Sequence, residues 1–109
     1  MSQLTTLLEK VQERNLTKTD LEAYHTELTN LFAQILIEAS ELEKEEALYF
    51  LEAKEIYRTT HEGKDTSDIA VKRLWRGTEK GQRLITLKAY SKAIEKVLSS
   101  LRNRIYATL

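Results

Sequence analysis

The stretch TDLEAYHTELTNLFAQILIEASELEKEEALYFLEAKEIYRTTH, residues 19–61, decides the fold of this chain. Apolar side chains recur in it at a strict seven-residue interval, at Leu21, Leu28, Ile35, Leu42, Tyr49 and Ile56. Six consecutive heptads without a helix breaker predict one long helix over about residues 20–61. The residues Thr19-Asp20-Leu21-Glu22 have the pattern of a capping box, in which the threonine hydroxyl and the glutamate carboxylate each accept from an otherwise unpaired backbone N–H group. We therefore expect the helix to begin at Asp20.

The segments on either side of this stretch predict two more helices. Leu4, Leu7, Leu8 and Val11 share one face of a short helix over about residues 3–15, with Ser2 as its N-cap. Residues 62–67, EGKDTS, hold the first glycine and several cap-forming side chains, so they predict a turn. A second long helix should follow over about residues 68–107. The expected fold is all-α, a single domain (residues 1–109) built as a long antiparallel, coiled-coil-like helical hairpin with a short N-terminal helix.

Two glycines make the second long helix uncertain. Each of Gly77 and Gly81 costs a helix interior about 1 kcal/mol relative to alanine. The helix either breaks there, with Thr78 as a new N-cap, or continues, with the glycines allowing a neighbouring helix to approach closely. Ala70, Leu74, Gly77, Gly81 and Leu84 lie on one stripe at 3–4 spacing, and this favours the continuous helix.

Composition excludes several classes of protein. The 109 residues include no Pro and no Cys, so disulfides, thiolate zinc sites and a cysteine nucleophile are ruled out. The longest apolar stretch, residues 31–37, is far shorter than the roughly 20 residues of a membrane span. The N-terminus resembles no signal peptide. We expect a soluble, cytoplasmic protein (in the host cytoplasm if it is viral) that contacts no membrane.

Charge is divided unevenly along the chain. Residues 1–63 hold 6 Lys/Arg and 13 Asp/Glu, whereas residues 64–109 hold 11 Lys/Arg and 4 Asp/Glu. Cations along a groove together with aromatic rings are typical of proteins that hold single-stranded nucleic acid without sequence preference. The candidate nucleic-acid-binding residues are Lys72, Arg73, Trp75, Arg76, Lys80, Arg83 and Lys88. The alternatives are that the positive helix pairs with the glutamate-rich helix, and that Trp75 is a packing residue.

Catalysis and metal binding have little support in the sequence. Glu22-Ala23-Tyr24-His25 is an E-x-x-H motif, but the di-iron bundles that use it need a second copy, which is missing here. His61, at the expected turn, is interpreted as a cation near the negative end of a helix dipole. We expect no catalytic residues, no metal and no cofactor, and the protein is predicted not to be an enzyme.

A bare two-helix hairpin cannot cover its own apolar stripes, because each helix must bury more width than one neighbour covers. We therefore expect a homo-oligomer, either a bundle of paired hairpins or a ring. The predicted interface residues are Leu42, Tyr49, Ile56, Leu87, Ile94, Leu98, Leu101 and Ile105.

A family resemblance accompanies this layout. Glu52-Ala53-Lys54-Glu55, the glycine-containing turn, the basic helix and the closing Leu87-Lys88-Ala89-Tyr90 and Leu98-Ser99-Ser100-Leu101-Arg102-Asn103-Arg104 resemble the small helical accessory proteins of tailed bacteriophages. The outline, over about residues 40–107, is similar to recombination mediators that load a recombinase onto single-stranded DNA. The resemblance implies a ring and DNA contacts at Lys72, Arg73, Arg76, Lys80 and Arg83.

Two functions are therefore compared. The first is a non-catalytic, oligomeric DNA recombination accessory protein that binds single-stranded DNA or RNA, a recombination protein, or both, through its basic helix. The second is a viral-type adaptor, inhibitor or scaffold that binds protein partners and no nucleic acid.

Overall fold

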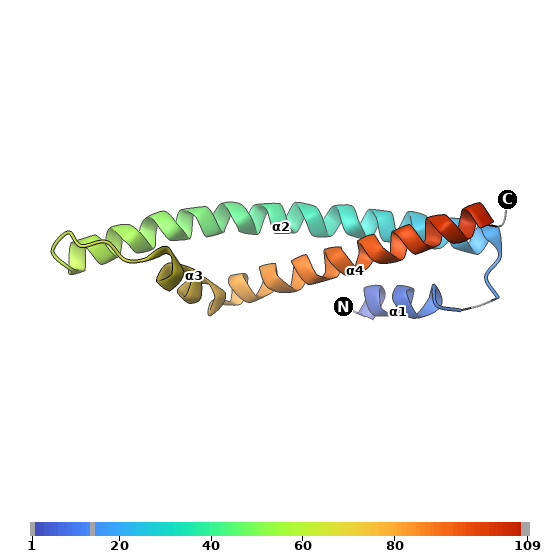
Figure 1. Cartoon of the computed structure of the whole chain (residues 1–109), viewed down its shortest axis with the longest axis horizontal. Coiled ribbons are helices and arrows are strands. Elements are labelled where there is room, and N and C mark those ends of the chain that lie inside the picture. The colour runs from blue at the N-terminus through green and yellow to red at the C-terminus, as the bar shows by residue number, and fades with distance from the viewer. Residues whose placement is uncertain (1, 14, 108–109) are drawn as a thin grey trace. The chain divides into compact units, whose positions relative to one another are not determined.

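The computed structural model of the chain describes residues 2–13 and 15–107. These residues form four α-helices and no strand (Figure 1). The helices are α1 (Ser2–Lys10), α2 (Lys18–Thr60), α3 (Asp68–Arg76) and α4 (Glu79–Ala107). The all-α helical hairpin with a short N-terminal helix is thus confirmed. No helix in the described part of the chain has the length and apolar character that a membrane crossing requires.

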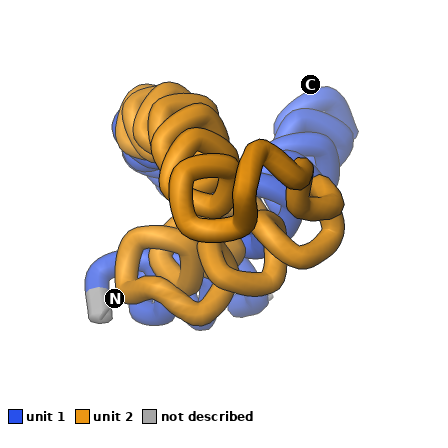
Figure 2. The backbone as a smooth tube through the Cα atoms, turned by 90° about the vertical axis from the view of Figure 1, so that its left-hand side faces the viewer, with its two compact units in different colours: residues 1–36, 89–109 blue, residues 37–88 orange. Residues whose placement is uncertain are grey.

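Two compact units divide the chain, and Figure 2 colours them separately. The first unit comprises residues 1–36 and 89–109, and the second comprises residues 37–88. Both α2 and α4 contribute to each unit, because the boundary falls inside these helices.

The first unit is built around leucines and isoleucines from three helices. Its buried side chains come from α1 and the residue after it (Leu4, Leu7, Val11), from α2 (Leu21, Leu28, Leu31, Ile35) and from α4 (Ile94, Leu98, Leu101). Leu28 and Ile94 have no exposed surface at all. Full burial of such a side chain contributes about 1.5–3 kcal/mol, so this cluster is the main source of stability in the unit.

The second unit is an antiparallel hairpin. Its buried apolar side chains are Ala39 and Leu42 of α2, Val71 and Trp75 of α3, and Leu84 and Leu87 of α4. Ion pairs mark the direction of the chain: Glu45 of α2 pairs with Lys80, and Lys54, further along α2, pairs with the earlier residue Asp68. The chain that returns after the turn therefore runs antiparallel to α2.

The start of α2 differs from the prediction. The helix begins at Lys18, not at Asp20, and its capping box is formed by Thr17 and Asp20. The Asp20 N–H donates to Thr17 Oγ1 at 3.1 Å, and the Thr17 N–H donates to Asp20 Oδ2 at 3.1 Å. An aspartate thus takes the role that the sequence analysis assigned to Glu22, which instead lies 3.9 Å from Lys18 in an exposed pair.

The end of α1 also differs from the prediction, because the helix stops at Lys10 and not near residue 15. After Val11, two residues form tighter i→i+3 hydrogen bonds, from the Gln12 N–H to Glu9 O and from the Glu13 N–H to Lys10 O. The guanidinium of Arg104 in α4 donates to the carbonyls of Val11 and Glu13, the latter at 3.0 Å. These carbonyls are therefore paired with a side chain and not with a further turn of helix. Ser2 is the predicted N-cap of this helix, and its side chain lies outside the described part of the structure.

The second long helix is broken, so the preference for a continuous helix is wrong. After Arg76, Gly77 closes α3, and Thr78 caps α4 by accepting from the Gly81 N–H at 3.0 Å. The Thr78 hydroxyl also donates to Trp75 O at 2.6 Å. The break leaves this carbonyl without its usual i→i+4 donor, and the hydroxyl takes that donor's place. This is the alternative in which Thr78 begins a new helix.

The turn at residues 62–67 lies where the sequence predicts it. Glu62 and Gly63 both have positive φ, at 54° and 80°, and the Gly63 N–H donates to Arg58 O at 2.8 Å. This i→i+5 bond closes α2 in the manner of a Schellman motif. Ser67 then caps α3 by accepting from the Ala70 N–H at 3.1 Å.

Candidate functional site

Three cations of α3 are free of ion pairs within the described residues. Lys72, Arg73 and Arg76 are exposed, because helical spacing places them away from the buried side chains of Val71 and Trp75. None of their charged groups forms a hydrogen bond or an ion pair within 4.0 Å among the described residues, although the charge of Lys72 contributes to lowering the pKa of Asp68. They are the members of the predicted nucleic-acid set that remain available to a ligand.

The cations of α4 are paired with glutamates of α2. Lys80 Nζ lies 2.7 Å from Glu45, and Lys88 Nζ lies 3.4 Å from Glu43. Arg83 forms a two-pronged contact with Glu38, from Nε at 3.1 Å and from Nη2 at 2.9 Å. These pairs are half-exposed, so each contributes under about 1 kcal/mol to stability. They correspond to the alternative in which the basic and acidic helices pair with each other.

Trp75 is a packing residue in this structure. Only 4% of its surface is exposed, and its ring meets that of Tyr49 at a centroid distance of 5.4 Å and an angle of 54°. Tilted ring pairs of this kind stabilise a core by about 0.5–1.5 kcal/mol beyond the area that they bury. The tryptophan therefore presents no open face on which a nucleic-acid base could stack.

Four of the predicted residues meet at one small cavity. Lys72, Trp75, Arg76 and Lys88 line a space of about 240 Å³ beside the break between α3 and α4. Glu46 lines the same space, so a carboxylate faces the cations. Arg73, Lys80 and Arg83 do not line it. The predicted basic track is thus divided between this cavity, the outer face of α3 and the pairs with α2.

Most of the predicted oligomer interface is buried inside the protein itself. Leu42, Leu87, Ile94, Leu98 and Leu101 are at most 8% exposed. Tyr49 and Ile105 are half-buried, and Ile56 is 64% exposed. A strict seven-residue row drifts by about 20° per heptad around a straight α-helix, so it leaves the packed face towards its end.

Apart from Ile56, the large exposed apolar side chains lie at positions outside the predicted interface. In the second unit they are Ile37, Leu48, Leu51, Ile69, Leu74 and Ile85, with Leu51 and Ile69 exposed at 69% and 65%. Leu48 and Leu51 sit off the heptad row among glutamates. A helical-wheel search for a second apolar stripe on α2, opposite the first, would have found them.

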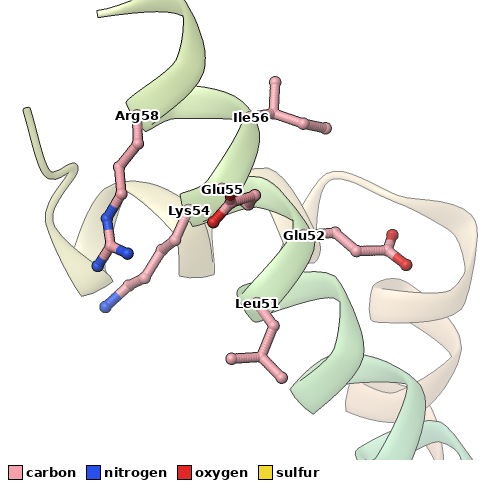
Figure 3. A pocket seen from close by; sticks show the side chains of 6 residues that line it. All are labelled: Leu51, Glu52, Lys54, Glu55, Ile56 and Arg58. Carbon is pink, nitrogen blue, oxygen red and sulfur yellow. The ribbon is translucent and has the colours of Figure 1, made fainter. Parts of the chain in front are cut away.

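Figure 3 shows a depression in the second unit, of about 530 Å³, formed by one stretch of α2. It is lined by Leu51, Glu52, Lys54, Glu55, Ile56 and Arg58. Lys54 and Arg58 extend together to one side of the helix, and Glu52 and Ile56 extend to the other. Lys54 pairs with Asp68, and Arg58 pairs with Asp65 at 2.6 Å. Glu52 and Glu55 form no ion pair within 4.0 Å among the described residues, although the charge of Glu55 contributes to raising the pKa of Arg58.

Each of those two ion pairs shifts the pKa of one of its members. The hydrogen bond from Lys54, reinforced by its charge, lowers the pKa of Asp68 below its ordinary value. The hydrogen bond to Asp65, reinforced by its charge, raises the pKa of Arg58. The Lys54–Asp68 pair joins the start of α3 to α2, and the Arg58–Asp65 pair joins the turn to α2.

The histidines do not gather metal ligands. Among the described residues no three His, Cys, Asp or Glu side chains form a group that could hold a metal ion. His61 stacks on Tyr57 with ring centroids 3.8 Å apart and planes 8° from parallel. His61 thus lies at the end of α2, where the sequence analysis placed a cation near the dipole.

Comparisons with known proteins supply no relative for this chain: no family model matches it, and neither does any curated protein or solved structure.

Proposed function

We propose that this protein is a non-catalytic helical module that acts through protein–protein contacts, including contacts between copies of itself. The observation that carries the proposal is the exposure of large apolar side chains in the second unit. Leu48, Leu51, Ile56 and Ile69 are each about 60–70% exposed. Clustered apolar side chains on a surface mark an interaction site more often than isolated ones do.

The pairing of the basic helix supports the same proposal. Lys80, Arg83 and Lys88 already have glutamate partners on α2. A phosphate backbone would have to displace these carboxylates before it could reach the cations. Trp75 is buried, so stacking on a base would require the core of the second unit to open.

Sedimentation of the full chain over a range of concentrations tests the proposal. We expect the average mass to exceed 12.7 kDa as concentration rises. Replacing Leu48 and Leu51 together with Ser should lower that association, because it removes the exposed apolar surface. Tyr106→Ser is the matched control, since Tyr106 is 71% exposed at the far end of α4. A mass of one chain at every concentration would refute self-association.

Binding of single-stranded DNA or RNA is the second candidate function, supported by the three unpaired cations of α3. If it holds, a labelled oligonucleotide should be retained at low salt and released as salt rises, because phosphate contacts release counterions. Replacing Arg73 and Arg76 together with Glu should abolish retention. Replacing Lys80 with Gln should change it little, because Lys80 is paired with Glu45. The recombination-accessory role requires this result together with oligomerisation.

A further inference from the structure

Two faces of the second unit complement each other in charge and in apolar character. The α2 face comprises Leu48, Leu51, Glu52, Glu55 and Ile56. The α3 face comprises Ile69, Lys72, Arg73 and Arg76. All nine side chains are exposed. The first face carries two carboxylates and the second carries three cations, and none of these five charged groups has an ion-pair partner among the described residues.

The cations near the α2 face do not cancel its charge. Lys54 and Arg58 line the same depression, but they extend away from Glu52 and Ile56 (Figure 3). Lys54 and Arg58 are neutralised by Asp68 and Asp65. The α2 face therefore presents Leu51, Leu48 and Ile56 around an excess of negative charge. Such a surface is complementary to an apolar side chain flanked by cations, which is what Ile69 offers on α3.

The two faces do not cover each other within one copy, because all nine of their side chains are exposed. Leu51 follows Leu42 by nine residues, two and a half helical turns, so it lies on the side of α2 opposite the buried Leu42. Arg73 lies two residues from both Val71 and Trp75, about 200° around α3 from the buried side chains. Leu51 and Arg73 thus point away from the core that α2 and α3 share, whereas the edges of both faces lie beside the other helix: Ile56 lines a depression with Leu74, and Arg76 lines the cavity with Glu46. Complementary surfaces that stay exposed in one copy are available to a second copy.

We propose that the α2 face of one copy binds the α3 face of a second copy. The inference rests on the proposed function, in which the protein associates with itself, and it specifies the contact. Because the two surfaces differ, each copy keeps one free face of each kind after the first contact. Such head-to-tail association continues until a ring closes or a filament forms.

Charge reversal on each face, in the full chain, tests the contact. One variant carries Arg73→Glu and Arg76→Glu, and the other carries Glu52→Lys and Glu55→Lys. In either variant alone the facing charges repel, and the dissociation constant measured by sedimentation should rise by about tenfold or more at low salt. The control carries Lys92→Glu and Lys96→Glu, which reverses two exposed cations of α4 outside both faces and should leave the constant within about threefold of the wild type.

Mixing the two variants gives the sharpest result. Reversed α3 faces then meet reversed α2 faces, so an equal mixture should regain association that neither variant shows alone. All four substitutions in one chain should restore self-association as well. Neither rescue would follow if the substitutions merely unfolded α3, and circular dichroism should show unchanged helicity in each variant.

Several outcomes would overturn the proposal. If the wild type associates and the Arg73/Arg76 variant associates equally well, the contact is elsewhere, although the proposed function stands. If the mixture and the four-fold variant remain as weak as the single-face variants, complementarity between the faces is refuted. If the Arg73/Arg76 variant loses only oligonucleotide binding, the α3 face serves nucleic acid instead. A wild type that is monomeric at every concentration would refute both the contact and the self-association on which it rests.

Discussion

The backbone of Gly81 lies against the main-chain carbonyl of Trp75, so closely that a Cβ atom on residue 81 would stand 1.9 Å from the Trp75 oxygen. The same carbonyl accepts from the Thr78 hydroxyl and from the Thr78 N–H. The break between α3 and α4 is therefore a specific structure that requires glycine at position 81. The sequence analysis linked such a contact to a continuous helix and a neighbouring helix packed on it, whereas Gly81 contacts the last turn of α3, just before the break.

Gly81→Ala should destabilise the protein by about 2–3 kcal/mol, since the clash is with backbone atoms that no side-chain rotation can relieve. Gly77→Ala is the matched control. A Cβ there would meet its nearest atoms at 3.4 and 3.7 Å, and its φ of −77° suits any residue, so the change should cost under about 1 kcal/mol. Chemical denaturation of the two variants measures both effects. Equal stability of the two variants would contradict this account of the break.

Trp75→Ala should destabilise the protein by about 3–5 kcal/mol, because it empties a buried site and removes the contact with Tyr49. The tryptophan fluorescence of the wild type should be blue-shifted, as for a ring away from water, and should not change when single-stranded oligonucleotide is added. Quenching by the oligonucleotide would instead favour a stacking role for Trp75.

Arg104→Ala should destabilise the first unit by about 1–3 kcal/mol, because it leaves the carbonyls of Val11 and Glu13 without the guanidinium that caps them. Arg102→Ala removes an exposed arginine two residues away and should change stability by no more than about 0.5 kcal/mol. Amide hydrogen exchange should show the loss of protection concentrated in α1. Uniform loss of protection over all helices would argue against a local cap.

The pKa of Asp68 gives a pH-dependent test of the contact between α2 and α3. Because the folded pKa is lowered, the Lys54–Asp68 pair stabilises the folded state above the ordinary carboxyl pKa, and that stability is lost as pH falls through the folded value. Lys54→Gln should raise the Asp68 pKa towards its ordinary value, as followed by NMR of the side-chain carboxyl. Lys44→Gln, which removes an exposed lysine of the same helix, is the control. An unchanged Asp68 pKa in the Lys54 variant would show that the pair does not persist in solution.

Local patterns were sufficient to predict the all-helical class, the long helix α2 and the turn, but not the end of α1 or the break between α3 and α4. Three features carry these predictions: the heptad row, the lack of proline and the glycine within residues 62–67. Each affects only the backbone nearby in sequence, so its effect can be predicted without knowledge of tertiary contacts. The capping box was found with the wrong members. Thr17-x-x-Asp20 and Thr19-x-x-Glu22 overlap, and choosing between them requires knowing where the chain from α1 enters.

The candidate site was predictable only in part. The charge division between the two halves correctly indicated that acidic and basic helices could pair, but spacing alone could not say which cations find partners. Lys80, Arg83 and Lys88 of α4 form ion pairs with glutamates of α2, whereas Lys72, Arg73 and Arg76 of α3 form none among the described residues.

The sequence by itself determined the helical class, the hairpin and the position of its turn, because helix propagation and termination depend on near neighbours along the chain. Only the tertiary structure decided that Trp75 packs on Tyr49, that Arg104 caps α1 and that Leu51 is exposed, since each depends on residues distant in sequence meeting in space. Apolar periodicity shows that a helix has a face to bury. It does not show whether that face is covered by the same chain or left for another.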